Sequence, residues 1–131
     1  MIVLDTHALI WWVDAASKLS KKAQQVTRAE ARRRELVASA ISVFEIVTLE
    51  RRGRLQFTTP VNEWLADLRK LPELTIQPVT DEVAQRAGGL GDVFPGDPAD
   101  RIIAATALVL GVPLITHDAK LLEVPNLPTV W

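Results

Sequence analysis

Short hydrophobic runs alternate along this chain with longer amphipathic segments. Four of the runs predict β-strands, and a fifth, very short run closes the sequence: residues 2–4, 36–40, 74–79, 112–116 and 129–131. The first run has no polar alternation, which is typical of parallel strands buried on both faces. The third run contains Pro78, which favours an edge position because proline lacks the N–H that a strand ladder needs.

The segments between the runs predict helices at residues 17–34, 42–52, 59–71, 81–87 and 97–110. Ser17 or Ser20 is the expected N-cap of the first helix. In the second helix we expect Phe44, Val47 and Ile46 to face the core. Strands that alternate with helices predict an α/β fold, in which a central, mostly parallel sheet of four or five strands is flanked by helices on both faces.

Length and composition narrow the class of protein. A chain of 131 residues can bury a hydrophobic core and is typical of one domain, here residues 1–131, with the Gly- and Pro-rich stretch 88–98 as a loop. The absence of cysteine excludes disulfide frameworks, thiolate zinc sites and cysteine nucleophiles. At the N-terminus, no basic segment precedes an apolar stretch of the kind found in signal peptides. The apolar residues 102–112 are too few to span a bilayer. We therefore expect a cytoplasmic protein with no membrane partner.

The net charge of −1 hides two opposed parts of the chain. Residues 18–54 carry ten basic and four acidic side chains, whereas residues 71–131 carry three basic and eight acidic ones. The basic clusters predict a track for a nucleic-acid phosphate backbone, although a solvated helix face is the usual meaning of such runs. The candidate RNA-binding residues are Arg28, Arg32, Arg33, Arg34, Arg51, Arg52 and Arg54.

Four acidic residues follow predicted strands or begin predicted helices. They are Asp5, Glu45, Asp100 and Asp118. In open parallel sheets, ligands bind outside the carboxyl ends of the strands, so these side chains are expected at one edge. Clustered carboxylates without thiolate or histidine ligands are suited to hard cations such as Mg²⁺ or Mn²⁺, and without a cation they would repel one another.

Each of these acids also has a structural interpretation. Ser42 and Glu45 fit a capping box, and Asp97 before Pro98 is a strong N-cap. Asp100 would complement the helix dipole or pair with Arg101, and Asp118 would be an ordinary turn residue. Asp5 is the hardest to explain by structure alone.

The polar and aromatic neighbours of these acids are further candidates. Thr6 and Thr116 add hydroxyl groups that can orient carboxylates and water. His7 and His117 lack the spacing of zinc ligands and are expected in loops. The adjacent residues Trp11 and Trp12 would either stack on bases or pack in the core or an interface. Their apolar neighbours favour packing.

Four segments give the chain a resemblance to a known family. They are MIVLDTHALIW at 1–11, SAISVFEI at 39–46, DPADRIIAATA at 97–107 and LITHDAKL at 114–121. In this order and spacing they resemble the PIN-domain ribonucleases, specifically the VapC-type toxins of toxin–antitoxin modules. The resemblance covers essentially the whole chain and implies a PIN fold.

The resemblance also implies an activity, a cofactor and partners. It implies a magnesium-dependent endoribonuclease toxin in which Asp5, Glu45, Asp100 and Asp118 hold Mg²⁺ or Mn²⁺ and orient the attacking water. Asp97 would reach the metal through water. Family members cut single-stranded or loop RNA, often tRNA or rRNA, are inhibited by a cognate antitoxin, and commonly form homodimers.

Two other functions remain open at this point. The chain could be a catalytically silent interaction module whose acidic groove receives an Arg or Lys from an antitoxin. It could also be a phosphohydrolase with Asp5 as nucleophile, but His7 stands where the haloacid-dehalogenase signature needs a second Asp. Candidate apolar surface for a dimer is limited to Trp11, Trp12 and Trp64.

Overall fold

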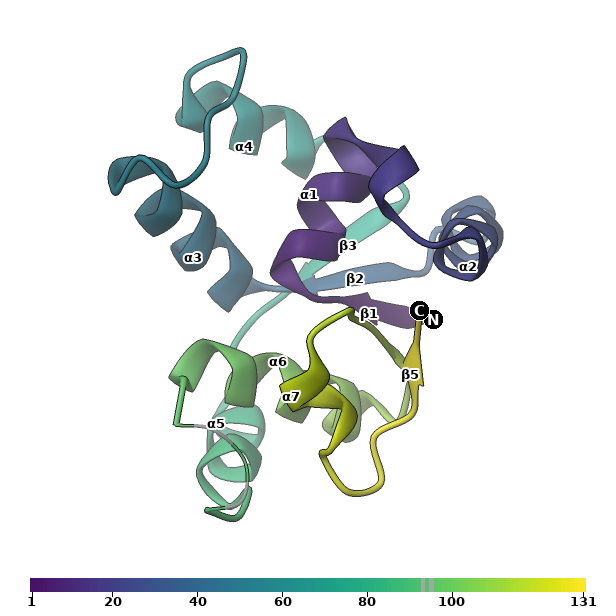
Figure 1. Ribbon diagram of the computed structural model, residues 1–131, viewed down its shortest axis with the longest axis vertical. Coiled ribbons are helices and arrows are strands. Elements are labelled where there is room, and N and C mark those ends of the chain that lie inside the picture. The colour runs from purple at the N-terminus through teal and green to yellow at the C-terminus, as the bar shows by residue number, and fades with distance from the viewer. Residues whose placement is uncertain (93, 95) are drawn as a thin grey trace.

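In the computed structural model, which describes residues 1–92, 94 and 96–131, five strands form one sheet in the order β3-β2-β1-β4-β5 (Figure 1). All four strand pairings are parallel. The strands are β1 (Ile2–Leu4), β2 (Leu36–Ser39), β3 (Leu74–Gln77), β4 (Leu114–Ile115) and β5 (Thr129–Val130). The predicted α/β class is confirmed, and the run that contains Pro78 supplies the edge strand β3.

Helices cover both faces of the sheet. Figure 1 shows α1 to α4 on one side and α5 to α7 on the other. The helices are α1 (Thr6–Asp14), the 3₁₀ helix η1 (Ala16–Lys18), α2 (Lys21–Arg32), α3 (Ala40–Arg51), α4 (Val61–Arg69), α5 (Asp81–Gly88), α6 (Pro98–Leu110) and α7 (Ala119–Leu122). None of the described helices is long and apolar enough to cross a membrane.

Alternate residues of β1 pack into two separate hydrophobic cores. Ile2 and Leu4 pack into the cluster under α1, α2 and α4, whereas Val3 packs into the cluster under α6. All three side chains are buried, which explains the continuous apolar run in the sequence. The pattern predicted neither α1 nor α7, because α1 is apolar on most sides and α7 has only four residues.

The beginning of α3 differs from the prediction. Ser39 is its N-cap and accepts a hydrogen bond from the Ile41 N–H, so the helix begins at Ala40 and the expected capping box does not form. Ile46 is fully buried as expected, but Phe44 and Val47 are 65% and 37% exposed, so their assignment to the core was wrong. The inward stripe consists of positions 42 and 46, one turn apart, which leaves the neighbouring apolar side chains outside.

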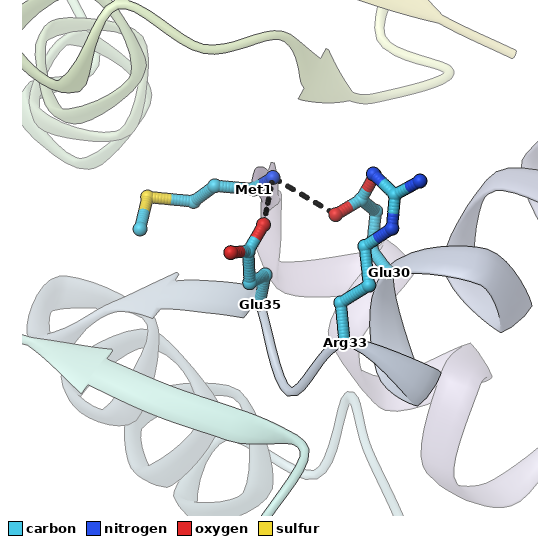
Figure 2. Close-up of polar contacts among 4 residues, drawn as sticks. All are labelled: Met1, Glu30, Arg33 and Glu35. Atoms are coloured by element: carbon cyan, nitrogen blue, oxygen red, sulfur yellow. Dashed lines mark hydrogen bonds and ion pairs between the residues drawn. The ribbon is translucent and has the colours of Figure 1, made fainter.

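Polar contacts join the amino ends of β1 and β2. The amino group of Met1 donates hydrogen bonds to Glu30 and Glu35 at 2.8 and 2.7 Å, and Arg33 lies 3.7 Å from Glu30 (Figure 2). These residues stand at the end of α2 and just before β2. They therefore lie at the amino ends of the strands, opposite to the carboxyl ends.

The predicted loop at 88–98 agrees with the structure where the structure describes it. Helix α5 ends at Gly88 and α6 begins at Pro98, capped by Asp97 as predicted. Positions 93 and 95 of this loop lie outside the described residues.

Candidate functional site

A cavity of about 510 Å³ opens at the carboxyl ends of the central strands and is lined by acidic side chains. Among the described residues that line it, Lys120 is the one lysine. The structure thus brings all of the sequence-predicted acids to one place. They are Asp5, Glu45, Asp97, Asp100 and Asp118.

Three of these acids begin helices. Asp5, Asp97 and Asp118 are the N-caps of α1, α6 and α7, and each accepts a backbone hydrogen bond through Oδ1, at 2.8, 3.0 and 3.0 Å. The structural interpretation is therefore correct for Asp97, and Asp5 also has a capping role. A cap occupies one carboxylate oxygen, so capping leaves the second oxygen of each group for other contacts.

A pair of hydroxyl groups lies beside Glu45, in the second turn of α3, and one of them contacts its carboxylate. Thr6 donates a hydrogen bond of 2.5 Å to Oε1 of Glu45, and its hydroxyl lies 2.9 Å from that of Ser42. Thr6 was a predicted orienting residue, and the structure places it beside a candidate ligand. From the sequence, Ser42 was expected only as a helix cap. The three-residue spacing from Ser42 to Glu45 was the signal that both share a helix face.

Thr116 connects two of the acids. Its hydroxyl accepts a hydrogen bond of 3.0 Å from the Asp118 N–H, and its side chain is fully buried at the end of β4. A hydrogen bond from the same hydroxyl to Asp5 counteracts part of the rise in the pKa of that carboxyl. The two sequence-predicted hydroxyl groups, those of Thr6 and Thr116, therefore both contact acids of the cavity.

Burial and mutual repulsion perturb the carboxyl groups. Burial raises the pKa of Asp5 and of Glu45 above their usual values, while hydrogen bonds from Thr116 and Thr6 respectively oppose the change. Burial, reinforced by Asp97, Asp118 and Glu45, raises the pKa of Asp100 to about 7. Carboxylates in such a cluster favour any state that removes negative charge, either by protonation or by a bound cation.

The donor set fits a hard cation. It offers carboxylate oxygens and hydroxyl groups, which are the ligands that Mg²⁺ and Mn²⁺ prefer. Within the described part of the chain, no group of three or more His, Asp or Glu side chains is already arranged to hold a metal ion.

A second cavity, of about 680 Å³, lies next to the first and shares Glu45 and Asp97 with it. Its lining contains the exposed ring of Phe44. It also contains three of the predicted RNA-binding residues, namely Arg51, Arg52 and Arg54. The structure thus places one basic cluster beside the acidic cavity.

The arginines of the first basic cluster lie elsewhere. Arg28 on α2 lines a small cavity together with Trp12 of α1, and Arg32 is the last residue of α2. Arg33 and Arg34 follow at the amino end of β2, across the sheet from the acids. The structure does not bring these four side chains to the acidic cavity.

Arg101 turns away from its neighbour Asp100. Its guanidinium donates hydrogen bonds to the backbone carbonyls of Ala87, Leu90 and Phe94, at the end of α5 and in the segment after it. The pairing with Asp100 that the sequence allowed is therefore replaced by contacts that tie this segment to α6. Asp100 keeps its carboxylate on the cavity.

The aromatic candidates separate in the same way. Trp11, His7 and His117 line the acidic cavity. Trp64 is only 7% exposed and donates a hydrogen bond of 3.0 Å to Asp14, so it is a core residue and offers no surface for a dimer. Its burial follows from its position on the inward stripe of α4 with Leu65.

Comparison with known sequences agrees with this geometry. The PIN domain family model matches residues 2–127. The chain is 39% identical over 133 residues to Ribonuclease VapC22 of Mycobacterium tuberculosis, and the match covers 99% of this chain and 98% of that protein.

Solved structures share the fold. VapBC2 from Rickettsia felis, bound to a DNA fragment from its promoter, has a TM-score of 0.72 at 18% identity, over 99% of this chain and 98% of that chain. FitAcB from Neisseria gonorrhoeae has a TM-score of 0.67 at 22% identity, over 100% and 97%. A toxin–antitoxin complex from Klebsiella pneumoniae has a TM-score of 0.65 at 20% identity, over 100% and 97%. These likenesses concern the fold.

Proposed function

The chain belongs to the PIN-domain family, as a ribonuclease toxin of the VapC kind, and from that premise we propose that it is a magnesium- or manganese-dependent endoribonuclease that hydrolyses tRNA or rRNA. One observation supports this most directly. Five carboxylates, each in or capping one of the four helices α1, α3, α6 and α7, line a single cavity at the carboxyl edge of the sheet, and three of them have raised pKa values.

The acids have distinct proposed roles. Asp5, Glu45, Asp100 and Asp118 would hold the cation, and Asp97 would contact it through water. A bound divalent cation supplies a water of lowered pKa and neutralises charge that develops on the scissile phosphate. Without that cation, the same carboxylates would repel an RNA phosphate, so binding of metal and of substrate should be coupled.

The hydroxyl groups would act by positioning. Thr6 and Ser42 direct Glu45, and Thr116 holds Asp118 while it contacts Asp5. Groups that orient metal ligands typically change metal affinity or activity by about 10- to 100-fold when they are removed.

Basic side chains would bind the phosphates of the RNA backbone next to the acids. The second cavity joins Arg51, Arg52 and Arg54 to Glu45, which suits a strand whose phosphates approach from α3. Arg28, Arg32, Arg33 and Arg34 would contact more distant parts of a folded RNA, because they lie in α2 and just before β2, outside the acidic cavity.

We further propose a cognate antitoxin as the inhibitor and a homodimer as the working assembly. The solved structures with this fold include toxin–antitoxin complexes. An acidic cavity with one lining lysine would attract an Arg or Lys side chain from such a partner. A catalytically silent module that only binds an antitoxin is the second candidate, favoured by the same charge.

Cleavage of naked RNA separates the two candidates. The purified full chain, without antitoxin, is incubated with tRNA and rRNA in Mg²⁺, in Mn²⁺ and in EDTA, and 5′ ends are mapped. We expect discrete cleavage that EDTA abolishes. Asp5→Asn should be inactive yet folded, because asparagine caps a helix as well as aspartate does. Glu123→Gln, an exposed acid outside the cavity, is the matched control. Full activity of Asp5→Asn would contradict the assignment.

A further inference from the structure

Four aromatic rings stand in a row beside the acidic cavity. The row runs His7, Trp11, Trp131 and His117, with successive ring centroids 5.8, 5.8 and 4.8 Å apart. The first two pairs are tilted by 54° and 55°, whereas His117 lies parallel to Trp131 within 1°. We call this row the aromatic wall. Three of its rings line the same cavity as the carboxylates.

His117 has one ring face in use and is otherwise exposed. It stacks on Trp131, which follows β5, and it stands between Thr116 and the cavity residue Asp118. Trp131 is itself half-buried and packs against the core beneath α1. A firmly held indole therefore supports an imidazole whose other face is available to a ligand.

Hydrophobic packing accounts for only part of the wall. Trp11 and Trp131 join the core cluster under α1, so packing explains their presence. It does not explain the exposed imidazoles of His7 and His117, which bury little apolar surface at the rim. Polarisable rings of this kind, beside a site for phosphate chemistry, are what unpaired bases stack on.

The size of the cavity leaves room for a base. A divalent cation with about six waters occupies about 200 Å³, at about 30 Å³ for each water. The cavity measures about 510 Å³, so a hydrated cation fills less than half of it. The remaining space adjoins the aromatic wall, which lines the same cavity.

We infer that the aromatic wall is a base-binding subsite, in which one unpaired base of the RNA stacks on the free face of His117, supported by Trp131. The base would belong to a nucleotide next to the scissile phosphate, because Asp118 directly follows His117. This inference rests on the proposed ribonuclease function. Stacking accepts every base, and the larger purines bind more tightly than pyrimidines.

Variants of His117 test the protein side. Binding of fluorescein-labelled hexaadenylate is measured by anisotropy, with Ca²⁺ in place of Mg²⁺ to prevent cleavage. We expect His117→Ala to weaken binding about 5- to 100-fold, the range that corresponds to one stacked base. His117→Phe keeps a flat ring without the imidazole nitrogens and should bind within about twofold of the wild type. Thermal unfolding checks that each variant is folded.

A matched control removes a ring elsewhere. Phe57 lies 4.7 Å from Trp64, tilted by 32°, and does not line the acidic cavity among the residues described. Phe57→Ala should leave RNA affinity unchanged. If it weakened binding as much as His117→Ala did, the loss would reflect general destabilisation, and the inference would be wrong.

Modified RNA tests the other side with the unaltered protein. An abasic ribose is placed in turn at each position of the hexaadenylate. One position should cost the wild type about fivefold or more, and the same substitution should cost His117→Ala almost nothing, because the partner ring is already absent. Equal losses in both proteins at every position would contradict stacking on His117.

The remaining outcomes also decide the matter. Unchanged RNA binding in His117→Ala, with cleavage still dependent on Asp5, would overturn the subsite and leave the ribonuclease function standing. Equal losses in His117→Phe and His117→Ala would assign the effect to the imidazole nitrogens and overturn stacking. Weakened binding of the antitoxin alone would identify the wall as a protein interface. A wild type that neither binds nor cleaves RNA would overturn both proposals.

Discussion

The hydroxyl of Thr6 donates a hydrogen bond of 2.5 Å to Oε1 of Glu45 and so joins the first turn of α1 to the second turn of α3. The two residues are 39 positions apart in the chain, and they lie on the helices that follow β1 and β2. Burial raises the pKa of Glu45, and this hydrogen bond opposes the rise because it stabilises the charged form. The contact thus favours the ionised form of an acid that lines the cavity.

Thr6→Val should lower ribonuclease activity while the fold persists. Valine has the same shape but cannot donate, so Glu45 loses its orienting contact, and kcat/KM should fall about 10- to 100-fold. The fall should shrink as the Mg²⁺ concentration rises, because weaker cation binding is its cause. Thr27→Val is the control, since that hydroxyl bonds only backbone carbonyls within α2. An equal loss in both variants would indicate a general effect on stability.

Cleavage at limiting Mg²⁺ should increase as pH rises through about 7. The pKa of Asp100 is raised to about 7, and a protonated carboxyl cannot serve as a cation ligand. Cation binding competes with that proton, so saturating Mg²⁺ should move the midpoint of the pH profile to lower pH. The rate is measured between about pH 5 and 9 at both concentrations. A midpoint that does not move with Mg²⁺ would show that the titrating group is not a ligand.

Asp100→Asn should stabilise the protein in EDTA at neutral and higher pH. The folded-state pKa of Asp100 lies above its ordinary value of 3.8, so its contribution to stability is fully present below that value and is lost as pH rises to about 7. The variant avoids the loss, so its unfolding midpoint should exceed that of the wild type by a few degrees at pH 8 and by less at pH 4.5. The half-exposed carboxyl limits the size of the effect.

Added Mg²⁺ should reverse that order. A ligand that binds the folded state raises its stability, and Asp100→Asn removes one proposed cation ligand. At pH 8, Mg²⁺ should therefore raise the unfolding midpoint of the wild type and scarcely change that of the variant. Equal shifts in both proteins would place the cation elsewhere.

Charge reversal should distinguish the two basic clusters. Arg51→Glu with Arg52→Glu removes two charges from the cavity beside Glu45, so the slope of log affinity against log salt should flatten by about 1 to 2 for a short single strand. Arg28→Glu with Arg32→Glu makes the same change in net charge on α2. We expect this second pair to affect a short strand little and a folded tRNA more. Equal effects on the short strand would show that the track runs along α2.

The strands and the acids were predictable because their signals are local. A buried parallel strand reads as a continuous apolar run, and Asp5 and Asp118 follow such runs closely. The direction of β1 and β4 then places both carboxylates at one edge. The N-cap at Asp97 was visible as well, since Pro98 follows it.

The errors share a physical cause. The start of α3 depends on Ser39, which was assigned to the end of a strand region, and the shifted start left Phe44 and Val47 on the surface. Periodicity cannot orient a helix that is apolar on several sides. Trp64 looked available for a dimer, but the inward stripe of α4 buries it.

The sequence by itself determined the fold class, the succession of the strands and of most helices along the chain, the oxygen-only donor set and the family, since each depends on residue type and on spacing within short segments. The tertiary structure decided which side chains meet. It joined Thr6 to Glu45, placed one basic cluster beside the acids and the other away from them, and assembled the aromatic wall from α1, the residue after β5 and the residues after β4. These contacts depend on strand pairing and helix packing between segments far apart in the chain, and local propensity carries no information about such distances.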